Sequence, residues 1–386
     1  MARCGSRAIT IRIKEIKQPM PNIRCVDCGS LYPSQGVPFR CQECGGIFDY
    51  DAPFQFSLDK LEPDLPGYWQ YRHAFALPAG APVVTLGEGN TPLLWEDFTG
   101  EKLGLKFESL NPTGSYKDRG SAVLASQLLA RGVKQAVEDS SGNAGASFAA
   151  YAAHARLSGR VYVPESASGP KRQQIEAYGA ELMRIPGPRS EAAKAVLTQV
   201  EQGVPYASHA YLPFGLAGIA TIAYEIWQQM GRTVPAALIA PVGHGGLLLG
   251  IVRGFQALVK AGLSNAEPYY VGVQAAACDP VVRAFEHGLD AMQSAPELPT
   301  LAEGVRVRTP VRARALIEHI SPGKGTFISI AEAEIQSSYQ QLAQRGYYVE
   351  PTSALVWAAY RELHRNLPQP AVAVLSGNGL KYIPTS

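Results

Sequence analysis

Strand-like and helix-like segments take turns along most of this chain, and this alternation restricts the fold more than any other feature. Residues 236–243, AALIAPVG, and 371–379, AVAVLSGNG, begin as short apolar runs of the kind that form buried strands. Residues 117–131, 143–157 and 247–262 have the length and apolar spacing of helices. We therefore predict an α/β fold with a parallel sheet and helices on both faces. Ligands of such folds bind at loops beyond the carboxyl ends of the strands.

Length and charge narrow the class of protein. The 386 residues suffice for two or three packed units, and 46% hydrophobic with 18% charged residues suits a large core. A formal net charge of +2 gives no reason to expect nucleic acid or an anionic membrane as a partner. No apolar window reaches the ~18 residues of a membrane-spanning helix, and residues 1–18 lack the apolar core of a signal peptide. We expect a cytoplasmic protein.

Four of the six cysteines form two pairs within residues 23–50. Cys25 and Cys28 make the first C-x-x-C pair, Cys41 and Cys44 make the second, and a glycine follows each. This is the pattern of a zinc ribbon, in which two tight turns offer four thiolates to one tetrahedral ion. Two disulfides are the alternative, which the lack of a secretion signal disfavours. A site with four thiolates has no open position, so this zinc would be structural and would help a short segment to fold.

One loop offers an amine. In residues 111–120, NPTGSYKDRG, Lys117 stands at the start of a predicted helix, with Ser115 as its candidate cap and Asp118 in its first turn. Taken alone, this loop is better explained by a solvated surface lysine.

A second loop offers a cradle for a carboxylate. In residues 138–147, EDSSGNAGAS, Ser140 and Ser141 supply hydroxyl groups. Asn143 begins a predicted helix, whose first N–H groups have no partner within the helix and can bind an anion. A plain helix cap accounts for one of these polar residues but not for the cluster.

Two more loops follow buried strands. In residues 240–250, APVGHGGLLLG, the backbone N–H groups of a glycine-rich turn at a helix start would form a nest for an anion. This turn is neither a Walker loop nor a GxGxxG motif, which counts against NAD, and a plain tight turn is the alternative. In residues 374–382, VLSGNGLKY, Ser376 offers a hydroxyl that would face a ring nitrogen or cap a turn. An amine, a carboxylate cradle, a phosphate nest and a lone hydroxyl are together what pyridoxal phosphate and an amino-acid substrate require.

The chain resembles the threonine synthase family of fold-type II pyridoxal-phosphate enzymes. Eight motifs in order carry the resemblance, from GEGNTPL at residues 87–93 to SGNG at residues 376–379, and between them stand NPTGSYKDRG, SSGNAGAS, IEAYGAEL, PVGHGG, LAEG and EPTSA. Many members of the family also carry an N-terminal cysteine ribbon. The resemblance implies a lyase with two α/β domains, of the tryptophan synthase β-like fold, and the cofactor between them.

Carried over by position, the resemblance implies a role for each loop. Lys117 would bind the cofactor covalently and act as general base for the α-proton. Asn143 would hydrogen-bond the ring oxygen of the cofactor, and Ser376 would face its pyridine nitrogen. A hydroxyl at that nitrogen gives a moderate electron sink, which suits elimination or replacement at the β or γ carbon. The substrate carboxylate would be held by Ser140, Ser141 and the start of the Asn143 helix, and the cofactor phosphate by the glycine loop, which comprises Gly243, His244, Gly245, Gly246 and Leu247.

Residues 209–221, HAYLPFGLAGIAT, depart from the family. There the family has N-x-x-N-P-x-R-x-E-G-x-K-T, which serves the phosphate of O-phosphohomoserine. The arginine is replaced by Gly215 and the second asparagine by Leu212, and the other changes are His209, Ala217 and Ala220. Losing the arginine removes the best bidentate phosphate ligand. His209, or Lys171 and Arg172, would compensate if they point inward, whereas a solvated helix end is the alternative.

Three hypotheses follow for the function. The first is a threonine synthase that holds the substrate phosphate with other residues. The second is a lyase or β-replacement enzyme for a non-phosphorylated amino acid, such as a serine or threonine deaminase or a diaminopropionate-type ammonia-lyase. The third is a non-catalytic zinc-ribbon protein, which the intact Lys117, Asn143, glycine loop and Ser376 make improbable.

The resemblance also implies the domain plan. We expect an N-terminal arm at residues 1–22, the zinc ribbon at 23–50, a large cofactor-binding domain at 51–119 and 216–386, and a small mobile domain at 120–215. Within the large domain, residues 51–82 are rich in proline and aromatic residues, and we predict that they form a connecting arm over the surface. By analogy with the family, we expect a homodimer.

Overall fold

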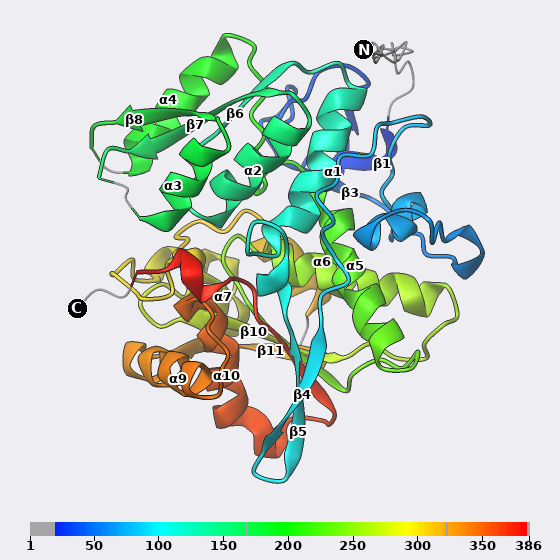
Figure 1. Cartoon of the computed structure of the whole chain (residues 1–386), viewed down its shortest axis with the longest axis vertical. Coiled ribbons are helices and arrows are strands. Elements are labelled where there is room, and N and C mark those ends of the chain that lie inside the picture. Colours follow the sequence, from blue (N-terminus) through cyan, green and yellow to red (C-terminus); the bar gives the residue numbers. More distant parts are fainter. Residues whose placement is uncertain (1–19, 167–168, 188, 321–322, 384–386) are drawn as a thin grey trace, which may run out of the picture.

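A computed structural model describes residues 20–166, 169–187, 189–320 and 323–383. Most of the predicted N-terminal arm, residues 1–19, lies outside these residues. Figure 1 shows two α/β units, one above the other. The small unit lies within the predicted range 120–215.

The large unit is built on a six-stranded sheet with the order β11-β10-β9-β12-β5-β4. Its central pairs are parallel, as predicted, but β4 pairs antiparallel with β5. Thr99 (φ 53°) and Gly100 (φ 88°) join these two strands in a tight hairpin turn. The strands are β4 (Leu93–Phe98), β5 (Glu101–Lys106), β9 (Ala237–Pro241), β10 (Tyr269–Ala275), β11 (Gly325–Ile330) and β12 (Ala371–Val374).

Helices cover both faces of the large sheet. Leu238 and Ala240 of β9 belong to the core that contains α5 and α6, whereas Ala237 and Ile239 belong to the core that contains α10. This alternation is the strand period of two, and it explains why β9 is apolar along its whole length. Helix α1 (Lys117–Ala130) connects this unit to the small one, and the helices of the large unit are α5 (Gly215–Gln229), α6 (Gly246–Lys260), α7 (Pro280–His287), α8 (Ala313–His319), α9 (Glu332–Gln344) and α10 (Pro351–Leu363).

The small unit has three parallel strands in the order β6-β7-β8. They are β6 (Gln135–Glu138), β7 (Ser158–Pro164) and β8 (Glu181–Ile185), and the helices around them are α2 (Asn143–His154), α3 (Pro170–Ala177) and α4 (Arg189–Glu201). Helix α1 packs against both α2 and α5. It is therefore buried almost all round.

Only part of the segment 51–82 lies on the surface, so the prediction of a connecting arm was wrong for its aromatic residues. Its aromatic side chains enter the core next to α5, where Tyr68, Trp69 and Tyr71 are fully buried. Each buried aromatic ring removes about 150–250 Å² of surface from water. The proline-rich, aperiodic pattern therefore marks an irregular part of the core. It contains the short 3₁₀ helices η1 (Leu58–Lys60) and η2 (Gly67–Ala74); the others are η3 (Glu108–Leu110), η4 (Leu289–Ser294), η5 (Glu303–Val305), η6 (His364–Asn366) and η7 (Gly379–Lys381).

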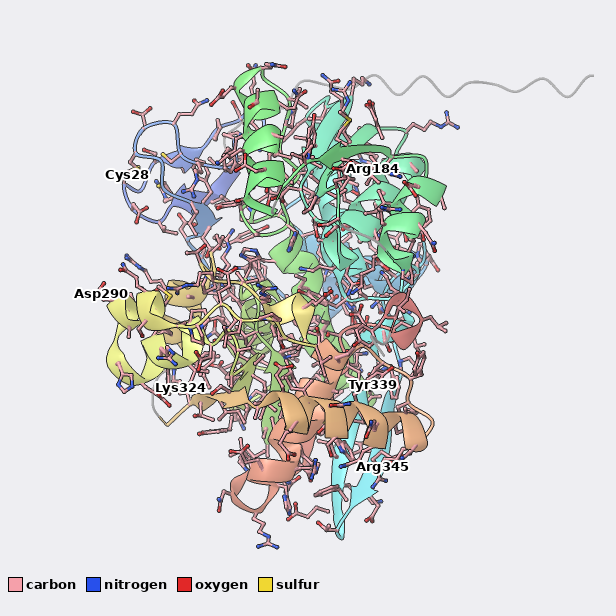
Figure 2. The ribbon with its side chains drawn as sticks, turned by 90° about the vertical axis from the view of Figure 1, so that its left-hand side faces the viewer. Cys28, Arg184, Asp290, Lys324, Tyr339 and Arg345 are labelled. Atoms are coloured by element: carbon pink, nitrogen blue, oxygen red, sulfur yellow. The ribbon has the colours of Figure 1, made fainter. Side chains whose placement is uncertain are left out.

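The cysteine segment forms a separate three-stranded antiparallel sheet, β2-β1-β3, made of β1 (Met20–Cys25), β2 (Leu31–Tyr32) and β3 (Phe48–Tyr50). We refer to residues 23–50 as the ribbon. Figure 2 shows Cys28 at its outer edge. In the described part of the chain, no helix combines the length and the apolar character that crossing a membrane requires.

Candidate active site

Lys117 lies where the glycine loop and α1 meet. Helix α1 begins at Lys117, and β9 leads through the glycine loop into α6, as the sequence predicts. One cavity is lined by Lys117 and Tyr116 on one side and by all five residues of the glycine loop, 243–247, on the other. The Lys117 Nζ atom is 4.8 Å from the centre of the Tyr116 ring. The amine and the predicted phosphate nest therefore face a common space.

Two glycines of the glycine loop, Gly243 and Gly245, have no room for a side chain. Gly245 has φ 94°, in the left-handed region that favours glycine, and a Cβ atom there would lie 2.8 Å from Leu316 Cδ1. A Cβ atom on Gly243 would lie 2.8 Å from the carbonyl oxygen of Gly304. Because Gly245 has no side chain with which to cap α6, the first N–H groups of that helix remain suited to an anion such as a phosphate.

Ser376 and Asn143 do not line that cavity. The backbone N–H of Tyr116, the neighbour of Lys117, donates to the carbonyl oxygen of Ser376 at 3.1 Å. The Asn143 Nδ2 atom donates to Glu350 Oε2 at 2.7 Å, and the Glu350 backbone N–H donates to Gly377 at 3.0 Å. Three of the four predicted loops are thus joined by hydrogen bonds, with Glu350 as the bridge between the Asn143 loop and the Ser376 loop.

Two buried polar atoms in the predicted loops have no hydrogen-bond partner within the described residues. They are Ser115 Oγ and Asn143 Oδ1. Ser115 is therefore not the helix cap that we predicted, since no side chain caps the start of α1. Buried polar groups are normally satisfied, so both atoms are available to a polar ligand. Together with the lysine and the glycine loop, they fit pyridoxal phosphate, which carries an aldehyde, a phosphate, a ring oxygen and a ring nitrogen.

The predicted carboxylate cradle forms a tight turn before α2. Ser140 is buried, and its Oγ atom accepts a hydrogen bond from the Gly142 backbone N–H at 3.2 Å. A Cβ atom on Gly145 would lie 1.8 Å from the Ser140 carbonyl oxygen, so the turn presses directly on the helix. Ser141 is only half-buried. Helix α2 begins at Asn143, as predicted, and no side chain caps it.

Asp118 is a residue of the site that sequence reasoning did not assign beyond its helical turn. It is fully buried and accepts hydrogen bonds from the Thr113 backbone N–H at 2.7 Å, Thr113 Oγ1 at 2.6 Å and Ser147 Oγ at 2.6 Å. Burial raises the pKa of Asp118 to about 6, although the hydrogen bonds from Ser147 and Thr113 act to lower it. The carboxyl group thereby fixes the loop before Lys117 to both α1 and α2.

A network of buried charges lies below the start of α1, and sequence reasoning missed it. Arg119 donates to Glu108 Oε2 at 2.6 Å and to Glu225 Oε2 at 2.7 Å. Lys106 also donates to Glu225 Oε2 at 2.7 Å. The sequence did hold one signal of this network, which is the arginine two residues after Lys117 in a helix rich in apolar and small residues. An arginine that is buried in such a helix must find a partner of opposite charge.

The altered segment 209–221 forms an apolar wall of the cavity. Leu212, Leu216 and Ile219 line it. Ala220 is fully buried, and a Cβ atom on Gly254 of α6 would lie 2.4 Å from its carbonyl oxygen. The small residues of α5 and α6 therefore serve close packing between these two helices.

His209 and Lys171 both point toward the site. The His209 ring lies 5.9 Å from the ring of His244 in the glycine loop, and its Nδ1 atom is 3.4 Å from Glu138 Oε1. Lys171 is not a solvated helix end, because its Nζ atom is 2.6 Å from Glu350 Oε1. Its charge is thus balanced by the same carboxylate that accepts from Asn143.

Comparisons with known proteins agree with this geometry. Residues 84–377 match the model of a family described as pyridoxal-phosphate dependent enzyme. Threonine synthase from Methanosarcina acetivorans is 33% identical over 355 residues, covering 89% of this chain and 87% of that protein. Threonine synthase from Methanocaldococcus jannaschii is 32% identical over 375 residues, covering 93% of this chain and 92% of that protein. The crystal structure of the threonine deaminase of T.th. superposes with a TM-score of 0.66 at 30% identity, covering 76% of this chain and 94% of that one.

Proposed function

We propose that this chain, which belongs to the pyridoxal-phosphate dependent enzyme family, catalyses β- or γ-elimination or replacement on an amino acid. We further propose that the leaving group of that amino acid is not a phosphate. The predicted cofactor and the fold-type II architecture are confirmed, and the chain is a threonine synthase-like lyase. The proposal concerns the substrate and the residues that act on it.

The site residues keep the roles that the resemblance implies. When bound, the cofactor supplies an electron sink for the charge left on the substrate when its α-proton departs. Lys117 Nζ binds the cofactor and later carries that proton. The glycine loop holds the phosphate through backbone N–H groups, Ser376 faces the ring nitrogen and Asn143 faces the ring oxygen. Ser140 and Ser141 orient the substrate carboxylate at the start of α2.

The apolar wall beside Lys117 is the observation that carries this proposal. Leu212, Leu216 and Ile219 line the cavity where a phosphate leaving group would need an arginine fork. Taking an ionised group out of water without partners costs several kcal/mol or more. The nearby Lys171 is already paired with Glu350 at 2.6 Å. A substrate with a hydroxyl or amine leaving group, such as serine, threonine or diaminopropionate, carries no such cost.

Conversion of O-phosphohomoserine to threonine is the second candidate, because the curated relatives are threonine synthases. In that case, Lys171 would have to exchange Glu350 for the substrate phosphate, with His209 as a further donor. This candidate predicts a strong preference for the phosphorylated substrate.

The holoenzyme should release ketoacid from at least one of serine, threonine and diaminopropionate. We expect kcat/KM for that substrate to exceed the value for O-phosphohomoserine by about tenfold or more, which corresponds to about 1.4 kcal/mol in transition-state binding. Ketoacid and phosphate release would be followed separately, with the Lys117→Ala protein as the background control. Efficient formation of threonine and phosphate from O-phosphohomoserine would overturn the substrate proposal and leave the cofactor assignment intact.

We also propose that the ribbon binds one structural zinc ion. Its four cysteine Sγ atoms lie within 4.8 Å of one another, and the Cys25–Cys44 and Cys28–Cys41 pairs are 3.4 and 3.6 Å apart. These distances are too long for disulfides, and they approach the ~3.8 Å spacing that four ligands at ~2.3 Å around a tetrahedral ion require. Gly29 and Gly45, both with φ 75°, donate to the carbonyl oxygens of Cys25 and Cys41 in two equivalent turns.

Metal analysis of the purified protein should find about one zinc ion per chain, as expected for a single four-thiolate site. The Cys28→Ser/Cys41→Ser variant should lose it, because serine does not supply a thiolate. Cys278→Ser is the matched control, since Cys278 is buried outside the cluster and should not affect the zinc content. Undiminished zinc in the double variant would refute the site.

The remaining proposals come from the family alone. They are closure of the small unit, residues 120–215, over the substrate, a homodimeric assembly and a cytoplasmic location.

A further inference from the structure

Buried ionic contacts join the ribbon to the glycine loop. We propose that Asp49, in β3 of the ribbon, is a positioning residue that holds the glycine loop in its phosphate-binding shape. The ribbon would then support cofactor affinity in addition to folding. This inference rests on one part of the proposed function, namely that the glycine loop binds the phosphate, and it does not depend on the substrate.

Asp49 is clamped between two arginines of the large unit. Its two carboxylate oxygens accept from Arg253 Nη1 at 2.6 Å and Nη2 at 2.9 Å, a bidentate pair. Its Oδ2 atom is also 3.2 Å from Arg312 Nη1. The exposed fractions are 5% for Asp49, 9% for Arg253 and 2% for Arg312. Burial alone would raise the pKa of Asp49, but the two guanidinium groups hold it below its usual value, so the carboxyl group stays ionised.

Both arginines belong to segments that shape the glycine loop. Arg253 lies on α6, the helix that begins in the loop at Gly246. The backbone N–H of Arg312 donates to the carbonyl oxygen of His244 at 2.9 Å. A Cβ atom on Gly245 would lie 3.1 Å from Arg312 Cβ, so Arg312 also packs against the left-handed residue of the loop.

The Arg312 guanidinium extends the connection to the segment 209–221, which forms the apolar wall of the cavity. It donates to the carbonyl oxygen of Phe48 in the ribbon at 2.9 Å and to that of Tyr211 at 2.8 Å. On the ribbon side, Phe48 is paired with the cysteine Cys25 across the β1–β3 ladder. A continuous series of contacts therefore runs from the proposed metal cluster, through Asp49 and Arg312, to the loop.

Removing the carboxylate charge would leave two buried guanidinium groups beside each other. Like charges in a poorly solvated interior repel strongly, and buried charges without partners draw in water. Arg312 would be the residue to move, because Arg253 is fixed in a regular helix. A shift of Arg312 would move the carbonyl group of His244, to which it donates, and would loosen the packing against Gly245. The N–H groups of the loop would then point in other directions and bind a phosphate less well.

Asp49→Asn should weaken binding of pyridoxal phosphate to the full-length apoprotein while affecting pyridoxal little. Pyridoxal has the same aldehyde and ring but no phosphate, so it reports Lys117 and the ring contacts alone. By analogy with residues that support ligands from the outer shell, we expect Kd for pyridoxal phosphate to rise by about tenfold or more. The Kd values for pyridoxal phosphate and for pyridoxal would be measured by titration, following the absorbance of the bound ligand. 31P NMR would report the environment of the bound phosphate. Asp51→Asn is the matched control, because Asp51 forms a largely exposed pair with Arg24 at 2.6 Å near the same ribbon.

A second variant guards against simple misfolding of Asp49→Asn. Arg312→Lys keeps the positive charge beside Asp49 but loses the planar fork to Phe48 and Tyr211, and it should cause the same phosphate-selective loss. Equal losses for pyridoxal phosphate and pyridoxal, or no loss in either variant, would overturn the proposal. If the unaltered protein itself bound both ligands equally, the assignment of the phosphate to the glycine loop would be wrong instead.

Discussion

Lys117→Ala should lose the visible absorbance of the covalently bound cofactor and lower kcat by about a thousandfold or more. Lys117 Nζ shares a cavity with the whole glycine loop, residues 243–247, so the amine lies within reach of a cofactor whose phosphate sits there. No other lysine lines that cavity within the described residues. The substitution therefore removes both the covalent anchor and the group that carries the α-proton.

Lys260→Ala is the matched control for this experiment, since Lys260 is exposed at the far end of α6. Spectra and kcat of that variant should equal those of the unaltered protein. Small primary amines added to Lys117→Ala should restore part of kcat if the lysine moves a proton, whereas a purely structural role would not respond. Persistence of the absorbance band in Lys117→Ala would assign the anchor to a different lysine.

Local patterns were sufficient to predict where the functional helices begin. Helices α1, α2 and α6 start at Lys117, Asn143 and Gly246. Each start follows a strand and a loop of small or polar residues, so period and turn chemistry both indicate it. Bringing these loops together required the rule that parallel strands end at one edge of the sheet, and also the resemblance to a family. Whether the individual side chains hold the cofactor stays a prediction.

Features that depend on distant partners could not be predicted. Asp49 and Arg253 are separated by 204 residues, and Arg119 and Glu225 by 106. From sequence alone, a charged residue is predicted to be exposed unless its partner is known. The contacts between Asp49 and the arginines and the network below α1 were therefore both missed. The aromatic residues of segment 51–82 were predicted to lie on the surface because the segment has no helix or strand period. Without such a period, the sequence pattern does not indicate which side chains are buried.

Arg119→Met should lower the free energy of unfolding by about 3–5 kcal/mol at neutral pH. Arg119 is fully buried and donates to both Glu108 and Glu225, so methionine of similar length would leave two buried carboxylates with one buried lysine, Lys106, between them. Urea denaturation would measure the loss. Arg160→Met is the control, because Arg160 pairs with Glu181 in an exposed position worth less than about 1 kcal/mol.

The pH dependence of this loss tests whether charge, rather than packing, is its cause. Burial raises the pKa of Glu225, but Arg119 and Lys106 outweigh it and hold that pKa at about 2. A lowered carboxyl pKa stabilises the fold above the ordinary value of about 4.5, and this contribution is lost as pH falls toward about 2. Without Arg119, the Glu225 pKa must rise, so the gap in stability between Arg119→Met and the unaltered protein should narrow between pH 4.5 and pH 2. Arg119→Met/Glu108→Gln should recover part of the stability at neutral pH, since one unpaired charge is gone. A gap that stays constant with pH, with no recovery in the double variant, would mean that Arg119 stabilises the protein by filling space.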